Sequence, residues 1–294
     1  MSIFVIFVTV VGWVIGFSIG ETPVEGYIWT GAALVFALLS AWVSYYTSDK
    51  LTLAISGAKE VKKKDAPELY RLVENEAITA GLPVPKVYII DDSAPNAFAT
   101  GRDPKHAVMA FTSGLLQKLS KPELEGVVAH EMSHIGNYDI RLMMIVVTLV
   151  GVIALLSDWF LRWTWFHPRH RSDENRQDQL GAILAIIALV LAILSPIIAA
   201  LMQLAISRKR EYLADASGAM LTRNPEGLAN ALIKISNDKE PLEVANKATA
   251  HLYICNPLKD KEGKGGAGWF ANLFNTHPPI EERVKRLKGM VGKV

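Results

Sequence analysis

The sequence predicts a mainly helical α+β protein, in which four membrane-spanning helices anchor a domain that contains a small sheet. Three observations support this fold class. Half of the 294 residues are apolar and the mean hydropathy is positive, as is typical of membrane proteins. Four long apolar blocks divide the chain. Between the second and third blocks lie short strand-like runs and helical periodicities, which predict a folded domain outside the membrane.

The four apolar blocks are residues 3–19, 27–46, 143–161 and 180–206. A helix needs about 20 apolar residues to cross the hydrocarbon core of a bilayer. The first two blocks carry no charge, whereas the third contains Asp158 and the fourth contains Pro196, which predicts a kink or tilt. Each block has the alternative of a buried core helix, and the first that of a signal peptide, although no basic residue precedes it.

These blocks predict the domain organisation and the orientation of the chain. We expect a two-span hairpin over residues 1–47, a second over 142–206, and one domain formed by 48–141 together with 207–294. Lysines follow the second block while residues 20–26 contain none, so the positive-inside rule places the domain in the cytoplasm. The loop between blocks three and four fits this rule poorly, because it carries Arg162, Arg169, Arg171 and Arg176.

Charge and cysteine content exclude two classes of protein. The formal net charge is only +2, from 31 basic and 29 acidic residues, so nucleic acid is not an expected partner. The single cysteine, Cys255, excludes an intrachain disulfide framework.

The stretch VVAHEMSHIGNYD, residues 127–139, carries a candidate metal site. Ser120 and Glu123 have the spacing of a capping box that begins a helix. His130 and His134 then lie four residues apart on one helical face, so both imidazoles can reach one cation, with Glu131 beside the open coordination position. The alternative is two surface histidines on a polar helix.

A catalytic zinc ion needs three protein ligands and one open position, so a further donor is expected. Asp139 is close in sequence, but a continuous helix would turn it away from the ion. The better candidate is Glu211, with Asp215 one turn later positioned to accept a hydrogen bond from a ligand histidine. Both carboxylates could instead belong to a solvated face, because basic residues flank them.

This constellation predicts hydrolysis of a peptide bond with one Zn²⁺ per chain. Glu131 is the expected base, which takes a proton from a water molecule activated by zinc and returns it to the leaving amine. Developing charge on the carbonyl oxygen needs a further donor. The Arg208/Arg210 pair and His277 are candidates, and the two prolines after His277 favour the histidine.

Strand-like runs at residues 84–92 and 106–114 predict a sheet that could bind an extended substrate. Asn96, Ala97 and Phe98 lie between the two runs and are the candidate substrate-binding residues, if they form an edge strand that pairs with the substrate backbone. A plain hairpin connection is the alternative. The run after Ala66 predicts an amphipathic helix whose apolar positions, Leu69, Leu72, Val73 and Ile78, would pack in the core.

Four motifs in this order, PNAFATG, HEMSH, SRKREYLADASGA and THPPIEERVKRL, resemble those of the HtpX-type membrane zinc metalloproteases. The resemblance covers nearly the whole chain. It implies a gluzincin-type domain facing the cytoplasm on a four-span anchor, in a plasma membrane of the prokaryotic type. It also implies endoproteolysis of damaged or misfolded membrane proteins, zinc bound by His130, His134 and Glu211, and Glu131 as the base.

Two other functions are compatible with a metal site in a membrane protein. A CAAX-type prenyl-protein protease has the same metal chemistry, but more spans than the four expected here. A transporter or scaffold subunit that binds metal without hydrolysis predicts ionisable groups inside the spans, and only Asp158, near an end, qualifies. The sequence leaves the oligomeric state open.

Overall fold

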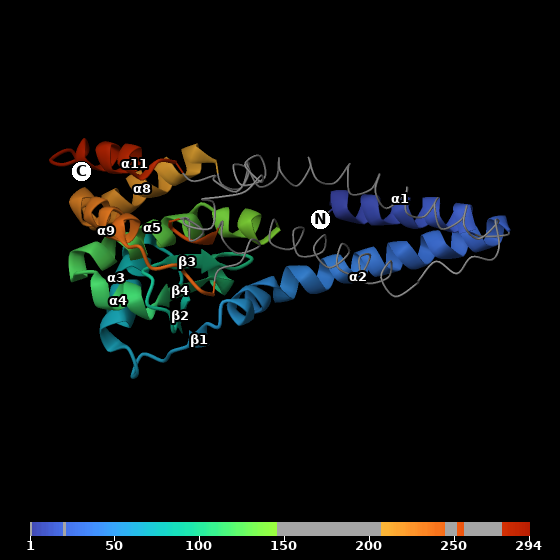
Figure 1. The fold of residues 1–294 in the computed structure, drawn as a ribbon, viewed down its shortest axis with the longest axis horizontal. Helices are drawn as coiled ribbons and strands as arrows, with labels where there is room; N and C mark the ends of the chain where they lie inside the picture. The colour runs from blue at the N-terminus through green and yellow to red at the C-terminus, as the bar shows by residue number, and fades with distance from the viewer. Residues whose placement is uncertain (1, 20–21, 146–206, 245–251, 256–277) are drawn as a thin grey trace. The chain divides into compact units, whose positions relative to one another are not determined.

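The protein was analysed as a computed structural model that describes residues 2–19, 22–145, 207–244, 252–255 and 278–294 (Figure 1). The described residues fall into two compact units, which meet in sequence between Thr47 and Ser48. The mainly helical α+β fold with a small sheet is confirmed. The third and fourth apolar blocks lie almost entirely outside the described residues. His277 also lies outside them.

The first unit contains α1 (Ser2–Ile19) and the first part of α2 (Pro23–Ile55), which lie side by side and run in opposite directions (Figure 1). Two glycines of α1, Gly12 and Gly16, face α2 so closely that an added Cβ would lie 2.1 Å from Ala33 Cβ and 2.6 Å from Trp29 Cβ. Among the described residues, the segment Pro23–Thr47 is the one helix long and apolar enough to cross a membrane.

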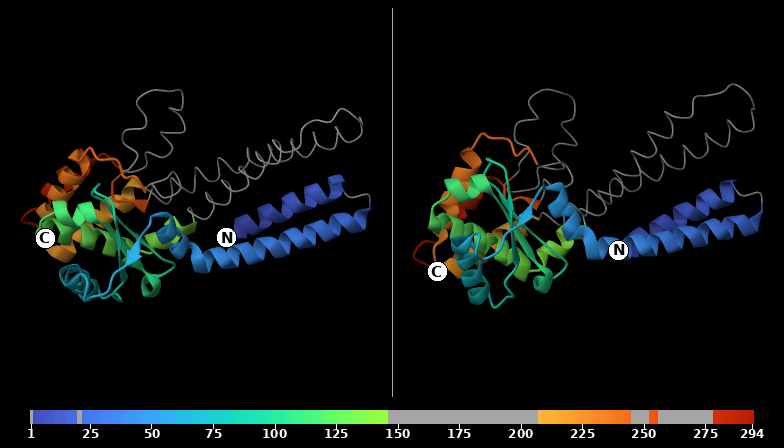
Figure 2. Two further views of the ribbon diagram at one scale, coloured as in Figure 1. Left: turned by 60° about the horizontal axis from the view of Figure 1, so that its bottom comes forward. Right: turned by 90° about the horizontal axis from the view of Figure 1, so that it is seen from below.

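The second unit is built on a four-stranded sheet of order β1-β2-β4-β3. Figure 2 shows this sheet with helices packed around it. The strands are β1 (Lys59–Glu60), β2 (Lys86–Ile90), β3 (Ala97–Thr100) and β4 (Val108–Thr112). β2 and β4 are parallel, while β1 and β3 pair antiparallel with β2 and β4. Strand β3 is therefore at an edge of the sheet. Of the three candidate residues, Ala97 and Phe98 lie in this edge strand and Asn96 directly precedes it.

Helices pack around this sheet and enclose the main core. They are α3 (Pro67–Ala80), α4 (Ser113–Lys118), α5 (Lys121–Gly136), α8 (Arg208–Thr222), α9 (Pro225–Asn237) and α11 (Ile280–Lys288), with a 3₁₀ turn at Pro104–His106. The central helix is α5, which packs against α3, α8, α9 and β3. The core position predicted for Ile78 in α3 is wrong: its side chain is 76% exposed and Ala77, one position earlier, is buried instead.

Two local features place α5. Its capping box forms as predicted, with the Ser120 N–H donating to the Glu123 carboxylate at 2.7 Å. The absence of a side chain at Gly126 lets α9 approach closely, since an added Cβ would lie 2.6 Å from the backbone nitrogen of Leu228. The middle of α5, which carries the histidines, is thereby held inside the domain.

Candidate metal centre

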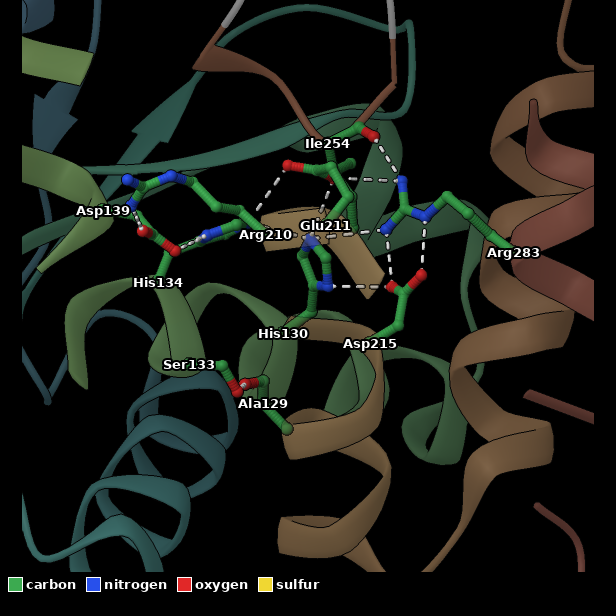
Figure 3. Close-up of polar contacts among 10 residues, drawn as sticks. All are labelled: Ala129, His130, Ser133, His134, Asp139, Arg210, Glu211, Asp215, Ile254 and Arg283. Carbon is green, nitrogen blue, oxygen red and sulfur yellow. Dashed lines mark hydrogen bonds and ion pairs between the residues drawn. The ribbon is translucent and has the colours of Figure 1, made fainter. Parts of the chain in front are cut away.

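His130 and His134 on α5 meet Glu211 of α8 inside the second unit (Figure 3). Glu211 Oε2 lies 3.8 Å from His130 Nε2, and Oε1 lies 3.6 Å from His134 Nε2. One ligand atom from each residue lies within 4.8 Å of the others, and all three side chains are buried. The two predicted histidines and the predicted carboxylate thus form one site.

The donor chemistry of this site fits a divalent cation. The Nε2 atoms of His130 and His134 lie 3.2 Å apart, while the Nδ1 atom of each ring faces a carboxylate. A ring that donates its Nδ1–H to a carboxylate presents a lone pair at Nε2. Two such lone pairs facing each other beside a carboxylate repel, and a cation between them removes the repulsion. Two imidazoles and one carboxylate are a ligand set typical of catalytic zinc.

Two further carboxylates orient the histidines. Asp215 Oδ1 lies 3.1 Å from His130 Nδ1, in the position predicted for it. Asp139 Oδ2 lies 3.0 Å from His134 Nδ1. The expectation that a continuous helix turns Asp139 away is wrong, because α5 ends at Gly136 and Tyr138 has a φ of 59°. The left-handed turn brings the Asp139 carboxylate back onto the ring.

Glu131 is 2% exposed and lies near His134 and Glu211. Helix α5 packs against β3, and the backbone of Ala99 in that strand lies near the Glu131 carboxylate. Burial raises the pKa of Glu131 to about 7, with His134 opposing this shift and Glu211 adding to it. A carboxyl group with a pKa in this range can both accept and return a proton near neutral pH.

Sequence reasoning missed Arg283, which is fully buried in α11. Its guanidinium donates to both Asp215 oxygens, at 2.9 and 2.7 Å, and to the backbone carbonyl of Ile254 at 3.1 Å (Figure 3). Its Nη1 also lies 3.5 Å from Glu211 Oε2. The Asp215 carboxylate raises the pKa of Arg283 against the opposing effect of burial. One signal was available, since Arg283 stands four residues before the buried Leu287 on the apolar face of α11.

The remaining candidate residues have different surroundings. Asn96, Ala97 and Phe98 are buried, and the Phe98 ring packs edge-on against Tyr253 at 5.2 Å, away from the metal ligands in a second apolar cluster. The Phe98 side chain therefore packs in that cluster, and its backbone pairs with Ala110 of β4. Arg210 is paired with Asp139, which places its guanidinium behind His134.

The family profile of "Peptidase family M48" matches residues 63–291. "Protease HtpX homolog" of Dictyoglomus thermophilum is 49% identical over 87% of this chain and 81% of its own length. "Protease HtpX homolog" of Tropheryma whipplei strain Twist is 50% identical over 87% of this chain and 84% of its own length. The crystal structure of Ste24p from S. mikatae has a TM-score of 0.51 at 18% identity. This chain spans 62% of that structure and shares its fold.

Fold and site together define a zinc metalloprotease whose ligands come from an H-E-x-x-H helix and a second helix. The membrane assignment agrees with the apolar segment Pro23–Thr47. The chain belongs to peptidase family M48 and is a homologue of the protease HtpX.

Proposed function

We propose that this enzyme is an integral-membrane endopeptidase that hydrolyses misfolded or damaged membrane proteins. The observation that carries the proposal is the position of Glu131, which is buried close to two of the zinc ligands and to the backbone of Ala99 on an edge strand. A peptide paired with that edge would have its backbone beside the proton acceptor. A site that only binds metal has no need of this arrangement.

The residues of this chain suggest a division of labour. When bound, zinc supplies Lewis acidity toward a peptide carbonyl and acidifies a water molecule. Glu131 takes a proton from the attacking water and delivers it to the leaving amine. Asp215 and Asp139 hold the two histidines in the tautomer that presents Nε2. The pairing of Arg210 with Asp139 favours a role in positioning His134 over direct contact with the transition state, and His277 remains a candidate for that contact.

The proposed anchor has four spans, with residues 1–47 and 142–206 as hairpins and residues 48–141 and 207–294 as the cytoplasmic protease domain. Pro23–Thr47 supports one of these spans. The second hairpin is supported by the sequence. Residues 142–206 separate His134 from Glu211, so this segment must cross the membrane an even number of times for both residues to reach the same site. Single cysteines placed in the 162–178 loop should react only from the outer side of sealed vesicles. Reaction from the cytoplasmic side would rule out the second hairpin.

The catalytic proposal is tested by Glu131→Gln in the zinc-loaded full chain. We expect this variant to keep its zinc, measured by elemental analysis, and to lose at least about 100-fold in kcat on casein, because a positioned base contributes about 10² to 10⁴ in rate. Glu125→Gln, on the same helix, is the matched control and should cleave like the parent. Full activity of Glu131→Gln would exclude Glu131 as the base.

The substrate class needs a separate measurement. A single-span membrane protein with a destabilising substitution, reconstituted with the enzyme, should be cleaved faster than its stable parent. Equal rates for the two would refute selection of misfolded membrane proteins, while leaving the peptidase chemistry in place.

A further inference from the structure

A short segment of the chain itself, residues 252–255, lies along the outer edge of β3. The Ile254 N–H donates to the Ala97 carbonyl at 3.0 Å. The Asn96 side-chain amide donates to the Cys255 carbonyl at 3.0 Å and accepts from the Cys255 N–H at 3.4 Å. Two of the three residues predicted to bind substrate, Asn96 and Ala97, are thus bonded to the protein's own backbone.

The register of β3 identifies which of its groups are available to a substrate. Phe98 and Thr100 stand opposite Ala110 and Val108, and Asn96 is bonded to Thr112, so these alternate residues pair with β4. Ala97 and Ala99 therefore direct their backbone groups to the outer edge. The Ile254 N–H binds the first of them, and the Glu131 carboxylate lies near the backbone of the second.

The other side of the segment is held beside the metal ligands. Arg283 Nη1 donates to the Ile254 carbonyl at 3.1 Å and lies 3.5 Å from Glu211 Oε2 (Figure 3). The Ile254 N–H thus donates to the edge strand, while the Ile254 carbonyl accepts from the Arg283 guanidinium, which lies next to the zinc ligand Glu211. This is the bonding pattern expected of a peptide lying in the cleft of a protease that binds its substrate by strand addition.

Anchors outside the cleft hold the segment in place. Leu252, Tyr253, Ile254 and Cys255 are all buried. The Tyr253 ring packs edge-on against Phe98, and its hydroxyl lies 3.4 Å from Ser56 Oγ, beyond the end of α2. The contacts of Tyr253 with Phe98 and Ser56 therefore hold the segment from the side that faces away from the metal ligands.

We propose that residues 252–255 are an internal pseudosubstrate, which occupies the edge of β3 and must leave it before a peptide pairs with Ala97. The proposal rests on the proposed function, since it assumes that substrate binds at this edge. Peptide binding then competes with docking of the segment. The smaller the fraction of molecules in which the segment is undocked, the higher the apparent KM for the peptide. Weakening the docking activates the enzyme without touching a zinc ligand or Glu131.

The first test measures amide hydrogen exchange of the zinc-loaded Glu131→Gln full chain in detergent, with and without a saturating unstructured peptide derived from casein. We expect the Ile254 and Cys255 amides to exchange faster in the presence of the peptide, because the segment gives up its partners. Exchange that is unchanged or slower with the peptide bound would show that the segment is a permanent wall of the cleft, and would overturn the proposal.

The second test uses Tyr253→Phe, which removes the hydroxyl near Ser56 and keeps the ring. Loss of one hydrogen bond should lower the KM for the same peptide by about 2- to 10-fold with kcat unchanged. Tyr88→Phe removes a hydroxyl that bonds Glu60 at 3.2 Å on the surface, and is the matched control with no expected change in KM. A KM that stays constant or rises in Tyr253→Phe contradicts the proposal.

The two tests separate this proposal from the proposed function. A protein that cleaves the peptide while Ile254 stays protected refutes the pseudosubstrate alone. A zinc-loaded parent that cleaves no peptide refutes the proposed function, and the pseudosubstrate with it.

Discussion

His134 Nδ1 and Asp139 Oδ2 lie 3.0 Å apart, although the helix that carries the histidine ends between the two residues. Asp139 in turn is paired with Arg210 of α8, the helix that supplies Glu211. The contact therefore joins both ligand-bearing helices behind the metal site. It fixes the ring of His134 and does not itself supply a ligand.

Replacement of Asp139 by alanine should weaken zinc binding. Loss of a carboxylate that orients a ligand histidine costs about 10- to 100-fold in metal affinity, because the ring is no longer held in one tautomer. Competition with a fluorescent chelator measures the affinity. Asp103→Ala is the matched control, since Asp103 contacts the surface histidine His106 at 2.7 Å and should leave zinc affinity unchanged. Unaltered affinity in Asp139→Ala would show that Asp139 does not support the site.

Replacement of Arg283 by methionine should strongly destabilise the protease domain. The substitution leaves Asp215 buried without its cation, and breaking a buried pair costs roughly 3 to 5 kcal/mol of unfolding free energy. Denaturant unfolding in detergent is the measurement. Arg286→Met, which removes the surface partner of Glu282 in the same helix, should have a much smaller effect. Equal effects of the two variants would show that the buried pair contributes little.

Replacement of Glu76 by glutamine should stabilise the protein in a pH-dependent way. Burial raises the pKa of Glu76 to about 7, with a smaller contribution from Glu125, and its Oε2 finds no hydrogen-bond partner among the described residues. Because the folded state binds this proton more tightly than the unfolded state, the contribution of the proton to stability is complete below about pH 4.5 and is lost as the pH rises through 7.

The stability gained by Glu76→Gln, relative to the parent, should therefore grow by about 2 kcal/mol between pH 5 and pH 8. Unfolding curves at the two pH values measure it. Glu68→Gln, at an exposed position of the same helix, controls for the loss of a surface carboxylate. A gain that does not depend on pH would mean that Glu76 is not the titrating group.

Replacement of Gly126 by alanine should loosen the packing of α5 against α9. The added Cβ would lie 2.6 Å from the Leu228 backbone, which cannot move aside alone, and such overpacking costs about 1 to 3 kcal/mol. The thermal midpoint of unfolding reports the change. Gly136→Ala, in the same helix, meets only the end of the Leu82 side chain at 3.3 Å and is the control. Gly126→Ala as stable as its control would show that the two helices tolerate greater separation.

The sequence alone determined the local features of this protein. Spacing along one helix identified His130, Glu131 and His134, because a separation of four residues places side chains on one face whatever surrounds them. The capping box at Ser120, the amphipathic α3 and the apolar segment Pro23–Thr47 also follow from local pattern and composition. Glu211 was found because a zinc site that lacks a ligand requires a donor from elsewhere.

Only the tertiary structure decided the features that depend on residues distant in sequence. Arg283 reaches Asp215 because α11 packs beside α8, and no local pattern specifies that pairing. Asp139 contacts His134 because the backbone adopts a left-handed conformation at Tyr138, which no sequence pattern predicts for a tyrosine. The hydrogen bond between the Ile254 N–H and the Ala97 carbonyl could not be predicted either, because the pairing of two backbone groups does not depend on which side chains they carry.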